Sequence, residues 1–183
     1  SNDYLALSKN GKVKKAAVLD IKINGVGSGG SKFVNGFSLN YKLVTDKMKE
    51  IKKCDDCLIF TSGYTANIGI FESLVKSRDI IFLDEECHAS TFAGVTLSGA
   101  KFMRFKHNDI SDLKNKLKKY SRMGERIIIA TEIVFSMSGD LLHNHNEYIE
   151  IAKEYNALFV TDEAHSFGVI ELTFEKYDLH IKM

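Results

Sequence analysis

Residues 126–165 read RIIIATEIVFSMSGDLLHNHNEYIEIAKEYNALFVTDEAH, and their pattern indicates the class of fold. Short, continuous apolar runs lie at 126–131 and 157–161, and an acidic residue follows each of them directly. Buried parallel strands have this pattern. Between the two runs, Tyr148, Ile149, Ala152 and Tyr155 recur at helical spacing. The stretch therefore predicts a strand, a helix and a second, parallel strand.

The same alternation extends toward the N-terminus. Further runs of strand length lie at 57–61, 80–83 and 101–105. Two more sets of apolar residues share one helical face each: Leu39, Leu43, Val44, Met48 and Ile51, and then Ile110, Leu113, Leu117 and Tyr120. We expect an α/β fold, a mainly parallel sheet with helices on both faces.

Composition limits the classes of function. The chain has 183 residues, of which 44% are hydrophobic, enough for the core of about one domain. A formal net charge of +1 argues against a nucleic-acid or anionic-membrane binder. No apolar run approaches the roughly 20 residues that span a bilayer, and nothing resembles a signal peptide, so we expect a cytoplasmic protein. Proline is absent, which leaves turns and helix ends to Gly, Asn, Asp and Ser.

Two motifs suggest other functions and fail on spacing. Cys54 and Cys57 have the spacing of half a zinc site, but no second pair follows and Cys87 is isolated. We therefore expect reduced thiols and no metal. Residues 25–32, GVGSGGSK, resemble a phosphate-binding P-loop, but the lysine comes one position late. Without a P-loop, the DEAH at 162–165 does not indicate a nucleotide-hydrolysing helicase.

Polar clusters follow all five predicted strands, at 62–64, 84–88, 107–109, 132–140 and 162–165. Ligands of open α/β sheets bind at the carboxyl ends of the strands, so the set predicts a small-molecule site. Gly63 opens a helix whose free amides would hold an anion. Asp162 could hold a protonated ring nitrogen, His165 a ring hydroxyl, and His88 could stack on a flat ring. Each residue alone reads equally well as structural, but in this order they describe a pyridoxal-phosphate pocket.

Successive blocks of the sequence resemble the α-oxoamine synthases, a family of pyridoxal-phosphate enzymes. The matching blocks are 1–5 (SNDYL), 27–31 (GSGGS), 62–67 (SGYTAN), 88–90 (HAS), 97–100 (LSGA), 105–109 (FKHND), 135–140 (FSMSGD) and 162–169 (DEAHSFGV). The resemblance implies part of the large domain of a fold-type-I enzyme, the aspartate-aminotransferase fold. It also implies condensation of an amino acid with an acyl-CoA thioester and loss of carbon dioxide. The blocks at 107–109 and 136–140 look nearest to the biotin-pathway branch. The threonine, aminolevulinate and sphingolipid branches stay open.

The same resemblance implies roles for single residues. Amides of Gly63 and Tyr64 would hold the phosphate of pyridoxal 5'-phosphate, and His88 would stack on its ring. Asp162 would pair with the ring N–H, and His165 with the phenolic oxygen.

Ser136 would lie beside that oxygen, Glu132 near the site and Asn2 toward the substrate. We expect residues 1–38 to form an N-terminal segment with a loop at a dimer interface, 39–170 an incomplete cofactor-binding domain, and 171–183 a divergent tail. The implied partners are an acyl-CoA or acyl-carrier thioester, a small amino acid, and a second identical or paired subunit.

The sequence departs from the family at one decisive position. The family's covalent lysine lies further along than this chain extends. Lys182 follows an apolar segment that could echo the strand before that lysine, but it is too close to His165 and lacks the preceding Ser or Thr. Three interpretations remain: a fragment of an active synthase, a catalytically inactive subunit or degenerate gene product, and an unrelated binding module. We expect the chain as it stands to bind the cofactor weakly if at all, to form no covalent adduct with it, and to be inactive alone because the covalent lysine is missing.

Overall fold

The computed structural model describes residues 1–34, 36–170, 172 and 174–183. These residues form two compact units, Ser1–Ile59 and Phe60–Met183. The tail predicted to start at Glu171 begins outside the described residues.

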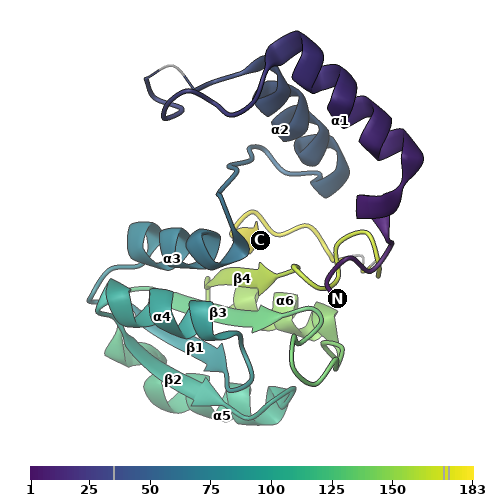
Figure 1. The fold of residues 1–183 in the computed structure, drawn as a ribbon. Coiled ribbons are helices and arrows are strands. Elements are labelled where there is room, and N and C mark those ends of the chain that lie inside the picture. Colours follow the sequence, from purple (N-terminus) through teal and green to yellow (C-terminus); the bar gives the residue numbers. More distant parts are fainter. Residues whose placement is uncertain (35, 171, 173) are drawn as a thin grey trace. The chain divides into compact units, whose positions relative to one another are not determined.

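A five-stranded parallel sheet forms the centre of the second unit (Figure 1). Its strands are β1 (Ile80–Asp84), β2 (Lys101–Phe105), β3 (Ile127–Glu132), β4 (Leu158–Asp162) and β5 (His180–Lys182). They lie side by side in the order β2-β1-β3-β4-β5, and every neighbouring pair is parallel. Four of the predicted strands are therefore confirmed. The apolar segment near Lys182 supplies the fifth strand.

Helices cover both faces of this sheet, which confirms the predicted fold class (Figure 1). On one face, α3 (Gly63–Leu74) and α4 (Ala89–Ser98) pack Phe71 and Val95 against the odd-numbered residues of β1. On the other face, α5 (Ile110–Tyr120) and α6 (His145–Glu154) enclose a core around Phe82 and Phe159. Side chains alternate between the faces of a strand, so each strand contributes to both cores.

The strand predicted at 57–61 is wrong. These residues have no regular secondary structure. No strand in the described part of the chain pairs with them, because β2 and β5 are the outermost strands of the sheet. Leu58 keeps 67% of its surface exposed, and Ile59 and Phe60 keep 41% each. Apolar content predicted a buried strand, but a strand forms only where a partner's backbone groups are available.

Asparagine carries out part of the work that proline does in other proteins. Asn108, Asn144 and Asn156 have φ between 48° and 53°, the left-handed region. Asparagine tolerates this conformation better than other non-glycine residues. Asn144 precedes α6, and Asn156 lies in the turn before β4. The expectation that residues other than proline shape the turns is confirmed at these positions.

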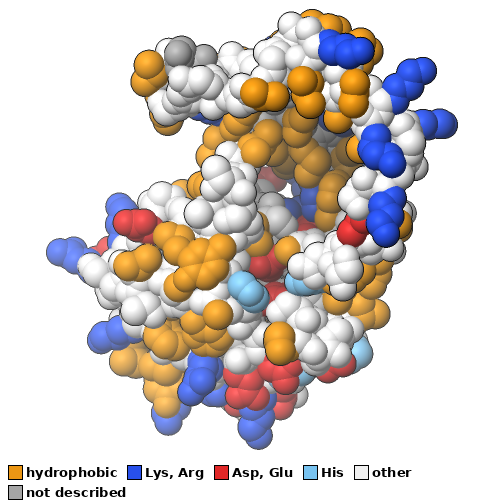
Figure 2. Space-filling model, viewed as in Figure 1, with side chains coloured by type: hydrophobic (Ala, Val, Ile, Leu, Met, Phe, Trp, Pro, Cys, Tyr) orange, Lys and Arg blue, Asp and Glu red, His pale blue; other side chains and the backbone are white. Residues whose placement is uncertain are grey.

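The described residues of the first unit form two α-helices, a short 3-10 helix at Leu7–Lys9 and their connections. The two α-helices are α1 (Gly11–Asn24), capped by Asn10, and α2 (Leu39–Lys52), capped by Ser38. The apolar face predicted for α2 is present but exposed, with Leu39 at 71% and Leu43 at 56%. Large apolar side chains are also exposed along α1 (Figure 2). Among the described residues, no helix combines the length and the apolar character that crossing a membrane requires.

Candidate cofactor site

The candidate site lies where the strand order reverses. The chain runs outward from β1 to β2 and then returns to place β3 on the other side of β1. Such a switch point opens a crevice at the carboxyl ends of the two central strands, and ligands bind there. His88 follows β1, and Glu132 ends β3. The backbone N–H of His88 donates a hydrogen bond to Oε1 of Glu132, which joins the two sides of the switch point.

Two buried carboxyl groups lie side by side at this edge. Glu132 of β3 and Asp162 of β4 are partners in the parallel register, so their side chains share one face of the sheet. Glu132 is 1% exposed and Asp162 is 9% exposed. Burial, followed by the negative charge of Asp162, raises the pKa of Glu132 from 4.5 to about 7. The pair therefore concentrates negative charge at a point that a cation would stabilise.

Asp162 is held by groups from two other elements. Its Oδ2 accepts a hydrogen bond of 3.0 Å from Nδ2 of Asn67 in α3. Its Oδ1 accepts one of 2.9 Å from the backbone N–H of Ala164. These bonds fix the orientation of the carboxylate. The sequence predicted Asp162 as a site residue but gave Asn67 no role, although Asn67 lies within the quoted 62–67 block.

His88 begins α4 and caps it. Its Nδ1 accepts a hydrogen bond of 3.2 Å from the backbone N–H of Ser90 and lies 2.6 Å from the Ser90 hydroxyl oxygen. Ser90 Oγ in turn accepts a bond of 2.9 Å from Nδ2 of Asn67. A continuous chain of hydrogen bonds therefore connects the predicted stacking ring with the predicted ring-nitrogen partner, Asp162.

The first turn of α3 provides an anion-binding end. Ser62 caps the helix in a reciprocal capping box with Thr65. Gly63 and Tyr64 follow, in the turn where a helix has backbone N–H groups without intrahelical acceptors. Among the described residues, a Cβ added at Gly63 would have the Met183 methyl carbon, at 3.9 Å, as its one neighbour within 4 Å. The backbone is thus open to close approach by a phosphate group.

Ser136 and His165 lie on loops at the same edge of the sheet. The backbone N–H of Ser136 donates to Oε2 of Glu132 at 3.2 Å. Its hydroxyl is buried and has no hydrogen-bond partner among the described residues. His165 lies half-buried in the turn that follows Asp162. Asn2 belongs to the other unit, Ser1–Ile59.

These features fit pyridoxal phosphate. The open first turn of α3 suits a phosphate group, and the buried carboxyl pair suits a protonated ring nitrogen. The unpartnered Ser136 hydroxyl offers a further hydrogen bond within the same crevice. The donors and acceptors present are therefore those that the cofactor needs.

A second network, which the sequence did not predict, supports the neighbouring strand ends. Asp84 is fully buried at the end of β1 and accepts a 3.1 Å bond from Nδ1 of His107. Nε2 of His107 lies 3.3 Å from Asp140. Burial acts to lower the pKa of His107. The hydrogen bond and charge of Asp84, the charge of Glu86 and the hydrogen bond to Asp140 act in the opposite direction and prevail, so the pKa of His107 is raised. The block at 107–109 contains His107, which follows β2. A histidine in that position can reach a carboxylate at the end of the neighbouring strand, so the sequence did hold a signal for this network.

Lys182 points away from this site. In the register of β4 and β5 it is the partner of Thr161, one residue before Asp162. Because side chains alternate between the faces, Lys182 and Asp162 lie on opposite sides of the sheet. Nζ of Lys182 lies 5.9 Å from the Phe174 ring, on the side of α6.

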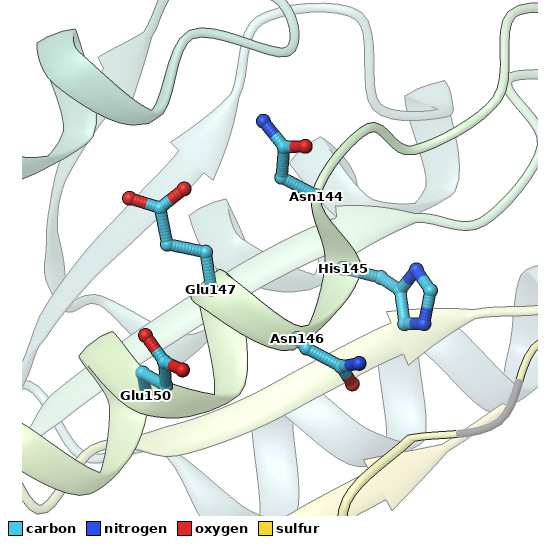
Figure 3. Close-up of a pocket in the computed structure, with 5 residues that line it drawn as sticks. All are labelled: Asn144, His145, Asn146, Glu147 and Glu150. Atoms are coloured by element: carbon cyan, nitrogen blue, oxygen red, sulfur yellow. The ribbon is translucent and has the colours of Figure 1, made fainter.

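Other candidate features of the unit lie apart from the site. A shallow hollow of about 350 Å³ lies at the start of α6, and none of its lining residues is a predicted site residue. Figure 3 shows the side chains that line it. Its lining consists of Asn144, His145, Asn146, Glu147 and Glu150. In the described part of the chain, no group of three or more His, Cys, Asp or Glu residues is arranged to hold a metal ion. Burial raises the pKa of the Cys87 thiol, which therefore stays protonated.

A parallel sheet with Glu132 and Asp162 beside its switch point is typical of an α/β protein that binds a small molecule at the carboxyl ends of its strands. The chain belongs to the aminotransferase class I and II family, whose model matches residues 1–180.

Relatives narrow the class. A protein of Aquifex aeolicus assigned as an 8-amino-7-oxononanoate synthase is 38% identical over 170 residues, 93% of this chain and 45% of that protein. A protein of Thermodesulfovibrio yellowstonii with the same assignment is 41% identical over 170 residues, which make up 93% of this chain and 43% of that protein. This chain thus spans less than half the length of these relatives.

Comparison with solved structures leads to the same group of enzymes. Serine palmitoyltransferase of Sphingomonas wittichii superposes with a TM-score of 0.83 at 29% identity, over 88% of this chain and 40% of that one. The 8-amino-7-oxononanoate synthase of Francisella tularensis gives 0.73 at 31% identity, over 93% and 45%. The resemblance to the α-oxoamine synthases is confirmed.

Proposed function

We propose that this chain is the cofactor-binding part of a pyridoxal-phosphate-dependent α-oxoamine synthase of the 8-amino-7-oxononanoate type, which serves biotin biosynthesis. The reaction breaks the bond between an amino acid's α-carbon and its carboxylate and forms a bond from that carbon to an acyl carbon. Carbon dioxide and the thiol of the acyl-CoA or acyl-carrier thioester leave. The buried pair Glu132 and Asp162, which lies beside His88 and the open start of α3, supports this function.

Bound pyridoxal phosphate supplies an electron sink for a carbanion at the amino-acid α-carbon. The residues of this chain bind and orient it. The amides of Gly63 and Tyr64 would hold the phosphate, and the His88 ring would stack on the pyridine. Asp162, held by Asn67 and Ala164, would keep the ring nitrogen protonated.

Three further side chains of the unit Phe60–Met183 complete the proposed cofactor site. His165 and Ser136 direct hydrogen bonds to the phenolic oxygen. Glu132 stores or releases a proton beside Asp162, since the pKa of its carboxyl lies at about 7. The family resemblance assigns Asn2, in the unit Ser1–Ile59, to the amino-acid substrate.

The identity of the substrates and the oligomeric state belong to the same proposal. The blocks at 107–109 and 136–140 favour the biotin-pathway branch. Its competitors are 2-amino-3-oxobutyrate CoA ligase, 5-aminolevulinate synthase and serine palmitoyltransferase. We place the enzyme in the cytoplasm as a homodimer or as one subunit of a pair. The exposed apolar side chains of α1 and α2 support an interface with a second subunit.

A second candidate function is a non-catalytic subunit with the same fold. The position of Lys182 favours it, because that lysine and Asp162 occupy opposite faces of the sheet. In either case this chain binds pyridoxal phosphate without forming a covalent bond to Lys182.

Borohydride trapping with mass spectrometry tests whether Lys182 forms a covalent bond to pyridoxal phosphate. Purified chain is mixed with pyridoxal phosphate, reduced, digested and searched for pyridoxyl-lysine, with Lys182→Ala treated in parallel. The expected result is no modification at position 182 above the level of exposed lysines such as Lys176, whose side chain is 93% exposed. Selective, saturable labelling of Lys182 would contradict this expectation. It would show that Lys182 reaches the cofactor site, against the register of β4 and β5, and that the chain contains its own covalent lysine.

A further inference from the structure

The protonation of His88 can be assigned from its neighbours. Nδ1 of the ring accepts the backbone N–H of Ser90 at 3.2 Å, as the cap of α4. A backbone N–H is a donor only, so Nδ1 must present its lone pair. A neutral imidazole carries one ring hydrogen, and the remaining position for it is Nε2.

The rest of the chain of hydrogen bonds has only one consistent direction. A carboxylate accepts only, so the atom of Asn67 that faces Asp162 at 3.0 Å is the amide nitrogen. That nitrogen has two hydrogens, and the second goes to Ser90 Oγ at 2.9 Å. The Ser90 hydroxyl is thus free to donate its own hydrogen to Nδ1 of His88, at 2.6 Å. Nδ1 of His88 therefore accepts from two donors, the backbone N–H and the hydroxyl of Ser90. Neither hydrogen bond can form if Nδ1 itself carries a hydrogen.

Burial protects this arrangement from exchange with water. Ser90 is 1% exposed and Asn67 is 2% exposed. Gly94 makes the contact between their helices: a Cβ there would lie 2.9 Å from the backbone oxygen of Asn67. The close approach of α3 and α4 therefore holds the Asn67 amide against Ser90. In a buried, fully directed network of this kind each bond strengthens its neighbours.

We infer that Asn67 and Ser90 are positioning residues, which hold His88 as the neutral tautomer with its hydrogen on Nε2 and tie the ring to the Asp162 carboxylate. The tautomer is a property of the chain itself. Its use in catalysis rests on the proposed function, in which the ring and the carboxylate contact one cofactor from two sides. Their relative position then depends on two residues that touch no cofactor atom.

Nitrogen-15 NMR of the histidine-labelled chain tests the inference without any cofactor. Two-bond proton–nitrogen couplings distinguish the two neutral tautomers, and the His88 signal is identified by its loss in His88→Asn. The wild-type ring is expected almost entirely as the Nε2–H form. Ser90→Ala should shift the tautomer ratio toward Nδ1–H by about fivefold, which is what the loss of one neutral hydrogen bond supplies. Asn67→Ala should shift it in the same direction.

Two variants separate positioning from general disruption. Thr91→Val removes the hydroxyl at the next position of α4, which is buried and has no hydrogen-bond partner among the described residues. It should leave the ratio unchanged. Ser90→Thr keeps the hydroxyl and should restore the wild-type ratio. Circular dichroism verifies that every variant compared is folded.

A wild-type His88 with its hydrogen on Nδ1 would overturn the inference. So would a tautomer ratio that Ser90→Ala and Asn67→Ala leave unchanged in folded protein. Failure of the proposed function has a different signature: the chain would not respond to pyridoxal phosphate, while the tautomer ratio and its response to Ser90→Ala would stay as described.

Discussion

Replacing Glu132 by glutamine should change the stability of the chain in a manner that reverses with pH. The pKa of Glu132 is raised from 4.5 to about 7 by burial and by the charge of Asp162. A carboxyl group with a raised pKa binds its proton more tightly when folded than when unfolded. It therefore lowers stability as the pH rises from about 4.5 to about 7. At about 1.4 kcal/mol for each pH unit, the ionised group costs the fold about 3 kcal/mol.

Glutamine has nearly the same shape and no charge to lose. Both carboxyl oxygens accept a backbone N–H, from His88 and from Ser136, and glutamine can accept only one of these bonds well. The lost bond costs about 1 kcal/mol at every pH. Glu132→Gln should therefore be slightly less stable than wild type at pH 5 and about 2 kcal/mol more stable at pH 8.5.

Urea denaturation followed by far-UV circular dichroism at both pH values measures the difference. Glu72→Gln, an exposed position on α3, controls for the loss of a carboxylate and should differ from wild type by less than about 0.5 kcal/mol at both. Comparison with wild type at each pH cancels the other titrating groups, including His107. If the difference between Glu132→Gln and wild type were the same at both pH values, the pKa of Glu132 would not be raised in the folded chain.

Two other substitutions test the packing and the neighbouring network. Gly94→Ala should lower the free energy of unfolding by about 1–3 kcal/mol, because the added Cβ would press on the Asn67 backbone. Gly11→Ala is the control in the same urea titration. Its Cβ would meet no described atom within 4 Å, so this variant should be as stable as wild type or more stable. Asp84→Asn should cost about 3 kcal/mol, since it breaks a buried pair with His107. The raised pKa of His107 provides stability that is present at low pH and is lost as the pH rises through that pKa, so the Asp84→Asn penalty should be larger at pH 6 than at pH 9. Equal penalties at the two pH values would show that the His107 charge does not contribute.

The sequence predicted the elements that local pattern controls. Continuous apolar runs with an acidic residue at the end identified β3 and β4, and the register then placed Glu132 beside Asp162. The run at 57–61 has the same apolar content, yet it forms no strand. Whether a strand forms depends on a neighbouring backbone, and a single segment's composition does not contain that information.

The residues that orient the site could not be predicted in the same way. Asn67 and Ser90 are polar residues of ordinary type, and their importance comes from a helix contact at Gly94 between distant segments. The face on which Lys182 lies depends on the register of β5, and a shift of one residue would reverse it. Sequence motifs identified the groups expected to touch a cofactor. Tertiary packing selected the groups that hold them in place.

Equilibrium binding of pyridoxal phosphate to the wild-type chain and to Asp162→Asn measures whether this edge of the sheet holds the cofactor. Asparagine keeps the shape of Asp162 but removes the charge that the proposed ring nitrogen needs. Absorbance titration should show saturable, non-covalent binding to the wild type, at least tenfold weaker binding to Asp162→Asn, and unchanged binding to Lys182→Ala. Equal affinity of the wild type and Asp162→Asn, or no saturable binding to either, would contradict the assignment of this edge of the sheet as a pyridoxal-phosphate site.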